Sequence, residues 1–195
     1  MKIRKFLAFM LAATTLFAFT SCGDDEEDGD VVINGHGYNI TIGALDIDGY
    51  DGGYHFALGR NLKDDPVICF DIPSEDFLGK TQDLTATNYS KDTGWWTCIW
   101  WSNMRTYWSD EKQDEEWRFK SGSLLVEKTG NTASVTVDGS DVVAEVFRVI
   151  AKGKTNDGNT FSISFEGPVI NYYWEFGGDI KAPKKEGAPQ IKRHN

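Results

Sequence analysis

The residues with the clearest binding chemistry lie in a tryptophan-rich segment. Six of the seven tryptophans of this 195-residue chain fall between positions 95 and 117. Indole rings offer apolar faces against which a sugar ring stacks, and Trp, Tyr and Arg also dominate protein-binding hot spots. We therefore predict a ligand platform, for a glycan or a partner protein, made of Trp100, Trp101, Arg105, Tyr107 and Trp108.

The tryptophans have a second interpretation as core residues. Alternate side chains of a strand point to opposite faces, so Trp101 and Trp100 would lie on different faces of one strand. Such a strand is either covered on both faces or presents an indole to solvent. The solvent exposure of Trp100 and Trp101 decides between core and platform. The charged run after them, Ser109–Glu116, is interpreted as a solvated turn.

Metal and catalytic signals are weak. The loop around Asp46, Asp48 and Asp51 contains three carboxylates. However, an EF-hand loop needs oxygen ligands at its positions 5 and 12, and Tyr50 and Ala57 occupy these positions here. The three aspartates are thus only weak candidates for a metal site. The sequence contains neither a nucleophile elbow nor a zinc-protease motif. We predict a non-enzymatic protein without a cofactor.

The chain has three cysteines, of which Cys69 and Cys98 fall in predicted strands. Outside the cytoplasm an even pair can form a disulfide if the Cα atoms lie within about 7 Å. Two buried thiols are the alternative. The third, Cys22, follows an apolar run of fourteen residues, Phe6–Phe19, with basic residues before it. A membrane-spanning helix needs about 20 apolar residues, so this layout predicts a secretory signal peptide.

The end of this leader resembles a bacterial lipobox. Thr20 and Ser21 are small and precede Cys22, although Phe19 stands where that signal usually has leucine. The resemblance implies a diacylglyceryl group and a further acyl chain such as palmitate on Cys22. Each buried methylene contributes roughly 0.8 kcal/mol, so several chains hold a protein durably on a membrane. An ordinary cleaved signal with a coincidental cysteine is the alternative.

A run of acidic residues follows the cysteine. Six of the residues from Cys22 to Asp30 are acidic, and such a block stays extended and solvated. It resembles the export tethers of surface lipoproteins in the Bacteroidota, which implies an outer-membrane protein displayed on the cell surface. An outer-membrane lipoprotein facing the periplasm is the alternative.

The net charge of the chain narrows the class of partner. The leader carries three positive and no negative charges, so its removal takes the formal net charge from −10 to −13. A polyanion lacks the Lys and Arg patches that contact phosphates, so we expect no nucleic-acid partner. It is also repelled by anionic membranes, so the lipid on Cys22 must supply the attachment.

The rest of the chain alternates short apolar runs with Gly, Asp and Asn, which is typical of antiparallel β proteins. Asn34-Gly35 predicts a tight hairpin, and the β-branched segment 142–151 is interpreted as a strand although a helix is conceivable. About ten strands predict an all-β antiparallel β-sandwich, with a lipocalin-like closed barrel that binds an apolar ligand as the alternative. We divide the chain into a signal peptide (1–21), a lipidated cysteine and tether (22–30), the sandwich (31–178) and a flexible basic tail (179–195).

Several turn and strand motifs resemble small domains of unknown function in Bacteroidota lipoproteins. They are the Gly79–Leu84 loop (GKTQDL), the Ser121–Val126 strand (SGSLLV) and the Phe161–Pro168 strand (FSISFEGP). The resemblance implies a fold and a location but no activity. On these grounds we expect a non-catalytic binding module, with a structural or accessory subunit of an envelope complex as the alternative.

Overall fold

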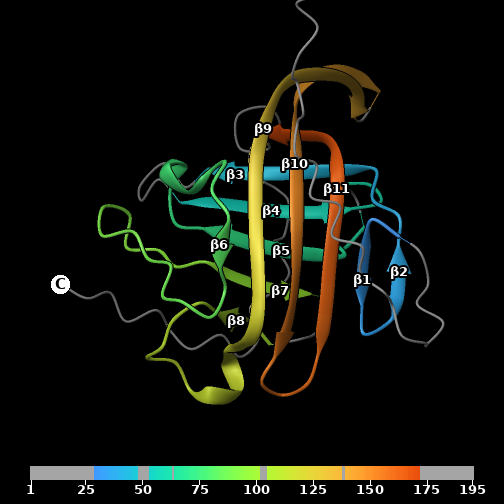
Figure 1. Cartoon of the computed structure of the whole chain (residues 1–195). Coiled ribbons are helices and arrows are strands. Elements are labelled where there is room, and N and C mark those ends of the chain that lie inside the picture. Colours follow the sequence, from blue (N-terminus) through green and yellow to red (C-terminus); the bar gives the residue numbers. More distant parts are fainter. Residues whose placement is uncertain (1–28, 48–52, 63, 102–104, 138, 172–195) are drawn as a thin grey trace, which may run out of the picture.

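A computed structural model describes residues 29–171 except 48–52, 63, 102–104 and 138 (Figure 1). Cys22, the tether, the basic tail and two of the weak metal candidates, Asp48 and Asp51, lie outside the described residues. No helix in the described part is long and apolar enough to cross a membrane.

The described part is all-β, as the sequence predicted, with two short 3-10 turns and no α-helix. The elements in chain order are β1 (Val31–Ile33), β2 (His36–Tyr38), β3 (Ile42–Ile47), β4 (Tyr54–Gly59), β5 (Ile68–Ile72), η1 (Glu75–Phe77), β6 (Gln82–Asp83), β7 (Cys98–Trp101), β8 (Tyr107–Trp108), η2 (Glu115–Trp117), β9 (Phe119–Val137), β10 (Ser140–Thr155) and β11 (Thr160–Asn171).

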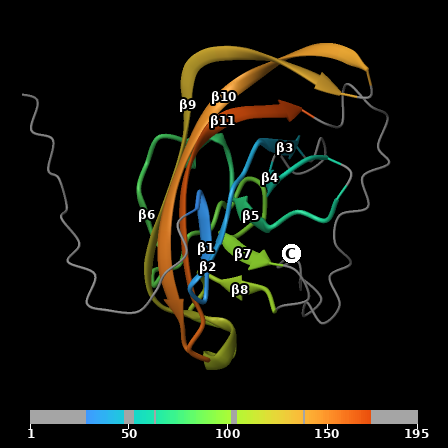
Figure 2. The same cartoon turned by 90° about the vertical axis from the view of Figure 1, so that its right-hand side faces the viewer.

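All eleven strands belong to one mixed sheet. Its order is β6-β9-β10-β11-β3-β4-β5-β7-β8, and β1 and β2 form a hairpin beside the first half of β11. The second half of β11 pairs with β3 in parallel, whereas the other strand pairs are antiparallel. Figures 1 and 2 show the three long strands crossing the short strands and hooking over them at one end, so the sheet curls into an open half-barrel.

The observed sheet differs from both architectures considered from the sequence, the β-sandwich and the closed barrel. Two layers do pack face to face, as in a sandwich, but β11 and β3 join them into a single sheet. The path ends at β6 and β8 and does not close, so the sheet is not the closed barrel considered as the alternative. Its interior is packed with side chains: the Phe56 ring lies 5.4 Å from that of Phe147 on the opposite layer and 4.9 Å from that of Phe70. This packed core sets the spacing between the layers.

Two local predictions are confirmed. Asn34 and Gly35 have φ of 51° and 83°, the two positive angles that a tight hairpin turn requires, and they connect β1 and β2. The segment 142–151 lies within strand β10. Asparagine adopts a positive φ more readily than most residues, and the side-chain oxygen of Asn34 accepts a 2.9 Å hydrogen bond from Thr160 N on the neighbouring strand β11.

Strand β9 is longer than the sequence pattern indicated. Short runs broken by Gly, Asp and Asn were expected, yet the pairing of β9 with β10 continues past Gly122 and Gly130, with a register shift between Lys128 and Thr132. At Gly122, φ is +150°, and a Cβ there would lie 2.6 Å from the carbonyl oxygen of Lys152. The missing side chain lets β9 and β10 approach closely, and the register between the two strands is continuous at Gly122.

Candidate functional site

The predicted platform is not an exposed surface. The aromatic side chains of Trp100, Trp101, Tyr107 and Trp108 are each at most 5 % exposed. Trp101 points into the main core, where its ring stacks 5.3 Å from that of Tyr107. Trp100 lies on the opposite face of β7, in a second apolar cluster. The interpretation of these residues as a solvent-facing platform is therefore wrong, because β7 is covered on both faces.

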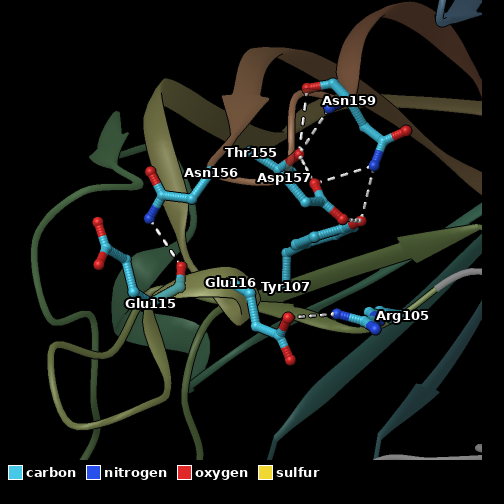
Figure 3. A network of polar contacts seen from close by, with 8 residues as sticks. All are labelled: Arg105, Tyr107, Glu115, Glu116, Thr155, Asn156, Asp157 and Asn159. Carbon is cyan, nitrogen blue, oxygen red and sulfur yellow. Dashed lines mark hydrogen bonds and ion pairs between the residues drawn. The ribbon is translucent and has the colours of Figure 1, made fainter.

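The fifth residue of the predicted platform, Arg105, is exposed. Its Nη1 atom lies 3.0 Å from Glu116 Oε2, and its guanidinium group lies over the Trp117 ring at 4.7 Å. These contacts hold Arg105 against the η2 turn (Figure 3). Arg105 is thus exposed at the surface, whereas the four aromatic residues of the predicted platform are buried.

The two cysteines are buried thiols and do not form the disulfide that the sequence allowed. Strand register explains this result: Cys69 faces Trp100 across β5 and β7, and Cys98 faces Asp71. The cysteines are therefore diagonal neighbours, and such positions are roughly 7–8 Å apart, beyond the usual span of a disulfide.

A polar row crosses the outer face of the sheet beside these thiols. The Asp71 carboxylate contacts His55 Nδ1 through one oxygen and accepts a 3.3 Å hydrogen bond from the Cys98 thiol through the other. Asp46 faces His55 in the next strand and is exposed. Among the described residues, no group of three or more His, Cys, Asp or Glu side chains could hold a metal ion.

A polar cavity of about 240 Å³ lies where β8, η2 and the start of β9 meet the β10–β11 turn. Of the predicted platform residues, only Trp108 contributes to its wall. Polar groups provide most of the lining. The lining residues are Leu84, Thr85, Trp108, Asp110, Glu111, Glu115, Arg118, Phe119, Lys120 and Asn156.

Hydrogen bonds hold three of the polar side chains that line the cavity. Arg118 donates from Nη1 to the carbonyl oxygen of Glu111 at 2.9 Å, and Asn156 donates from Nδ2 to that of Glu115 at 2.8 Å. Asp110 is buried and accepts bonds from Lys112 N and Gln113 Nε2 at 3.0 and 3.3 Å. The side chains of Glu111 and Glu115 take no part in these bonds and are exposed.

The Trp108 indole contains a buried polar atom. Its Nε1 atom is buried, and it donates to no acceptor among the described residues. A buried donor without a partner costs free energy of about 1–3 kcal/mol, so such groups concentrate where strain, water or a ligand plays a part. Trp108 is a lining residue of the cavity, but in the described part of the chain Trp101 Nε1 and Gln82 Nε2 are buried without an acceptor as well and do not belong to the lining, so the orphaned donor alone does not mark the site.

A second polar network holds the β10–β11 turn that carries Asn156 (Figure 3). The Tyr107 hydroxyl donates to Asp157 Oδ2 at 2.7 Å and accepts from Asn159 Nδ2 at 2.9 Å. The Asp157 carboxylate also accepts from Thr155 and Asn159. The buried end of β8 thus anchors a turn about fifty residues away in sequence, and the Asn156 wall of the cavity depends on it.

These contacts shift two pKa values. Burial raises the pKa of Tyr107 to about 12, and the bond to the Asp157 carboxylate acts in the same direction. For Asp157, burial alone would raise the pKa, but the bonds from Thr155, Tyr107 and Asn159 together lower it. At neutral pH the network therefore pairs a neutral phenol with a charged carboxylate.

Most of the cavity was not predicted from the sequence. The segment Ser109–Glu116 was expected to be a solvated turn, but its first two residues, Ser109 and Asp110, are buried. Ser109 donates to the carbonyl oxygen of Leu84 at 3.0 Å, which draws the start of this segment under the sheet. Arg118 and Asn156 carried no local signal, because strand pairing alone brings them together.

Comparison with protein-family models, with curated proteins and with solved structures gives no match to this chain. The resemblances noted in the sequence therefore stay predictions, and the geometry of the cavity is the basis for a function.

Proposed function

We propose that this protein is a lipid-anchored outer-membrane lipoprotein, displayed on the cell surface, whose β domain binds a glycan without catalysis. The leader, Cys22 and the acidic tether support the location. The cavity at Trp108 supports the activity, and it replaces the platform as the binding site.

The observation that carries the proposal is the mixture of groups around the cavity. Carboxylates accept hydrogen bonds, whereas the Arg118, Lys120 and Asn156 side chains can donate them, and a sugar hydroxyl can do both. Binding pockets combine such convergent polar groups with an apolar or aromatic wall, which Trp108 and Phe119 provide here.

A glycan array tests the binding. We expect the full chain, purified in detergent, to bind a subset of glycans and Arg118→Met to lose at least roughly tenfold in affinity, as for a lost hydrogen bond to a charged donor. Arg148→Met is the matched control, since Arg148 pairs with Glu127 on the outer face of the sheet. If no glycan binds the wild-type chain, or if both variants bind as it does, the proposal is wrong.

The anchor is tested separately in cells. Wild-type protein should incorporate labelled palmitate, fractionate with the outer membrane and be cut by protease added to intact cells. Cys22→Ser should lose the label and leave the membrane fraction. Labelled wild-type protein that resists the protease would instead indicate an anchor that faces the periplasm.

The burial of Trp100 and Trp101 favours a second candidate, an accessory subunit of an envelope complex that binds a partner protein. In that case the aromatic residues only stabilise the fold. Cross-linking in intact cells should then capture one defined envelope protein, and glycans should not compete for it.

A further inference from the structure

We propose that the Trp108 cavity selects an uncharged sugar residue and discriminates against acidic ones. This inference rests on the proposed glycan binding and names the class of ligand. It follows from the charges around the cavity, from their lack of mutual pairing and from the size of the hollow.

The lining has an excess of negative charge. Asp110, Glu111 and Glu115 oppose two cations, Arg118 and Lys120, which gives a formal charge of −1. Among the described residues, no ion pair joins either cation to any of these carboxylates. The two oxygens of Asp110 are held by neutral donors, which orient the carboxylate without neutralising it.

The main cation of the wall is already engaged. Arg118 directs Nη1 to a backbone carbonyl, which fixes the guanidinium group and leaves fewer of its donors for a ligand. An acidic sugar would therefore meet three carboxylates, the Lys120 ammonium group and one partly occupied guanidinium group, so the carboxylates outnumber the cations. A neutral sugar would meet acceptors and donors that its hydroxyl groups can satisfy in turn.

The dimensions limit the ligand to about one ring. A volume of about 240 Å³ lies below the roughly 300–1,000 Å³ of pockets for drug-sized ligands. Trp108 and Phe119 are nearly buried, so they offer a small apolar contact and the polar groups carry most of the selectivity. We therefore infer recognition of a single residue, at a chain end or a branch.

The test compares four matched methyl glycosides: a neutral hexose, an N-acetylhexosamine, a hexosamine and a hexuronate. Binding to the full chain in detergent is followed by ligand-observed NMR at constant ionic strength. We expect one of the neutral rings to bind, and the hexuronate to bind roughly fivefold or more weakly, as for one like-charge contact in water.

Two substitutions identify the source of the discrimination. Glu111→Gln with Glu115→Gln removes two carboxylates but keeps the backbone carbonyls that hold Arg118 and Asn156, and it should bring hexuronate binding to the level of the neutral ring. Glu166→Gln is the control, because Glu166 is exposed on β11 and lies outside the cavity lining. It should leave the discrimination unchanged.

The outcomes separate this inference from the proposed function. Equal or tighter binding of the hexuronate by the wild-type chain overturns the inference and leaves glycan binding standing. Discrimination that persists in the double variant also overturns it, because the carboxylates would not be the cause. Absence of binding by all four glycosides, together with a negative glycan array, overturns both.

Discussion

Two aromatic regions that look alike in the sequence behave differently in the structure. Strand β7 buries an indole on each face, with all four of its residues inaccessible to solvent. The segment from Trp108 to Phe119 also buries aromatic rings, but there they border a polar hollow lined by charged residues. Density of tryptophan is the same signal in both places, and the cavity lies at the second of them.

The difference lies in what surrounds the rings. Around Trp101 the neighbours are aromatic, with Tyr107 at 5.3 Å and Phe161 at 5.8 Å between ring centres. Trp108 packs with Trp100 in the second apolar cluster, but the sheet ends at β8 there, and the next elements are a loop and a short 3-10 turn. An aromatic cluster inside a sheet stabilises the fold, whereas one at the end of a sheet borders backbone and side chains that can meet a ligand.

Substitution of Trp101 should have the largest effect on stability. Trp101→Ala removes a buried indole from the main core and should lower the free energy of unfolding by about 3–5 kcal/mol. Urea denaturation followed by circular dichroism measures the change. Val143→Ala is the control, since Val143 is 71 % exposed and its loss should cost about 0.5 kcal/mol or less.

This result bears directly on the role of β7. Loss of glycan binding in Trp101→Ala would report unfolding and not a lost contact. A variant that keeps the wild-type stability but no longer binds would contradict the assignment of β7 to the core.

Loss of the Tyr107 hydroxyl should have a smaller effect and should lower the free energy of unfolding by about 1–3 kcal/mol. Tyr107→Phe keeps the ring but takes one donor from Asp157 and one acceptor from Asn159. The same urea experiment measures it. Tyr89→Phe is the matched control: the Tyr89 ring lies tilted against that of Trp96 at 4.5 Å between centres, and its hydroxyl makes no hydrogen bond with the described residues. Equal losses in both variants would show that the network does not hold the turn.

The raised pKa of Tyr107 predicts a loss of stability at high pH. The unfolded chain releases the phenol proton near pH 10, whereas the folded chain keeps it to about pH 12. Between these values the folded state binds more protons, so stability falls as pH rises. Urea midpoints at about pH 9 and about pH 11 should differ more in the wild type than in Tyr107→Phe. Tyr54, whose pKa burial also raises, contributes equally to both proteins.

Local chemistry predicted the local structure. The Asn34-Gly35 turn and the β-branched strand β10 both follow from backbone preferences of a few neighbouring residues. The continuity of β9 could not be predicted in this way, because a glycine such as Gly122 occurs both in turns and inside strands whose backbones approach closely. The parallel pairing of β11 with β3 depends on contacts more than a hundred residues apart, on which periodicity carries no information.

The cavity was less predictable than the fold. Trp108 was named from the sequence, but the choice of its neighbours on the platform was wrong. Asn156 comes from the β10–β11 turn and reaches the site through the pairing of long strands and the Tyr107 network. Asp110 lay in a run of charges whose composition indicates solvent, and its burial depends on the packing of Ser109 beneath Leu84.

Substitution of Arg105, which lies between β7 and β8 in the sequence, should have the smallest effect on stability and on binding. Arg105→Gln removes an ion pair in which both partners are about half exposed, and such pairs contribute roughly 0–1 kcal/mol. Some of the stacking on Trp117 at 4.7 Å is also lost, while the cavity lining is unchanged. We therefore expect urea midpoints and glycan affinity close to wild type, in contrast to the binding loss of Arg118→Met. A tenfold loss of affinity in Arg105→Gln would contradict this expectation. It would show that the binding surface extends from the cavity at Trp108 to the exposed side of η2, where Arg105 contacts Trp117.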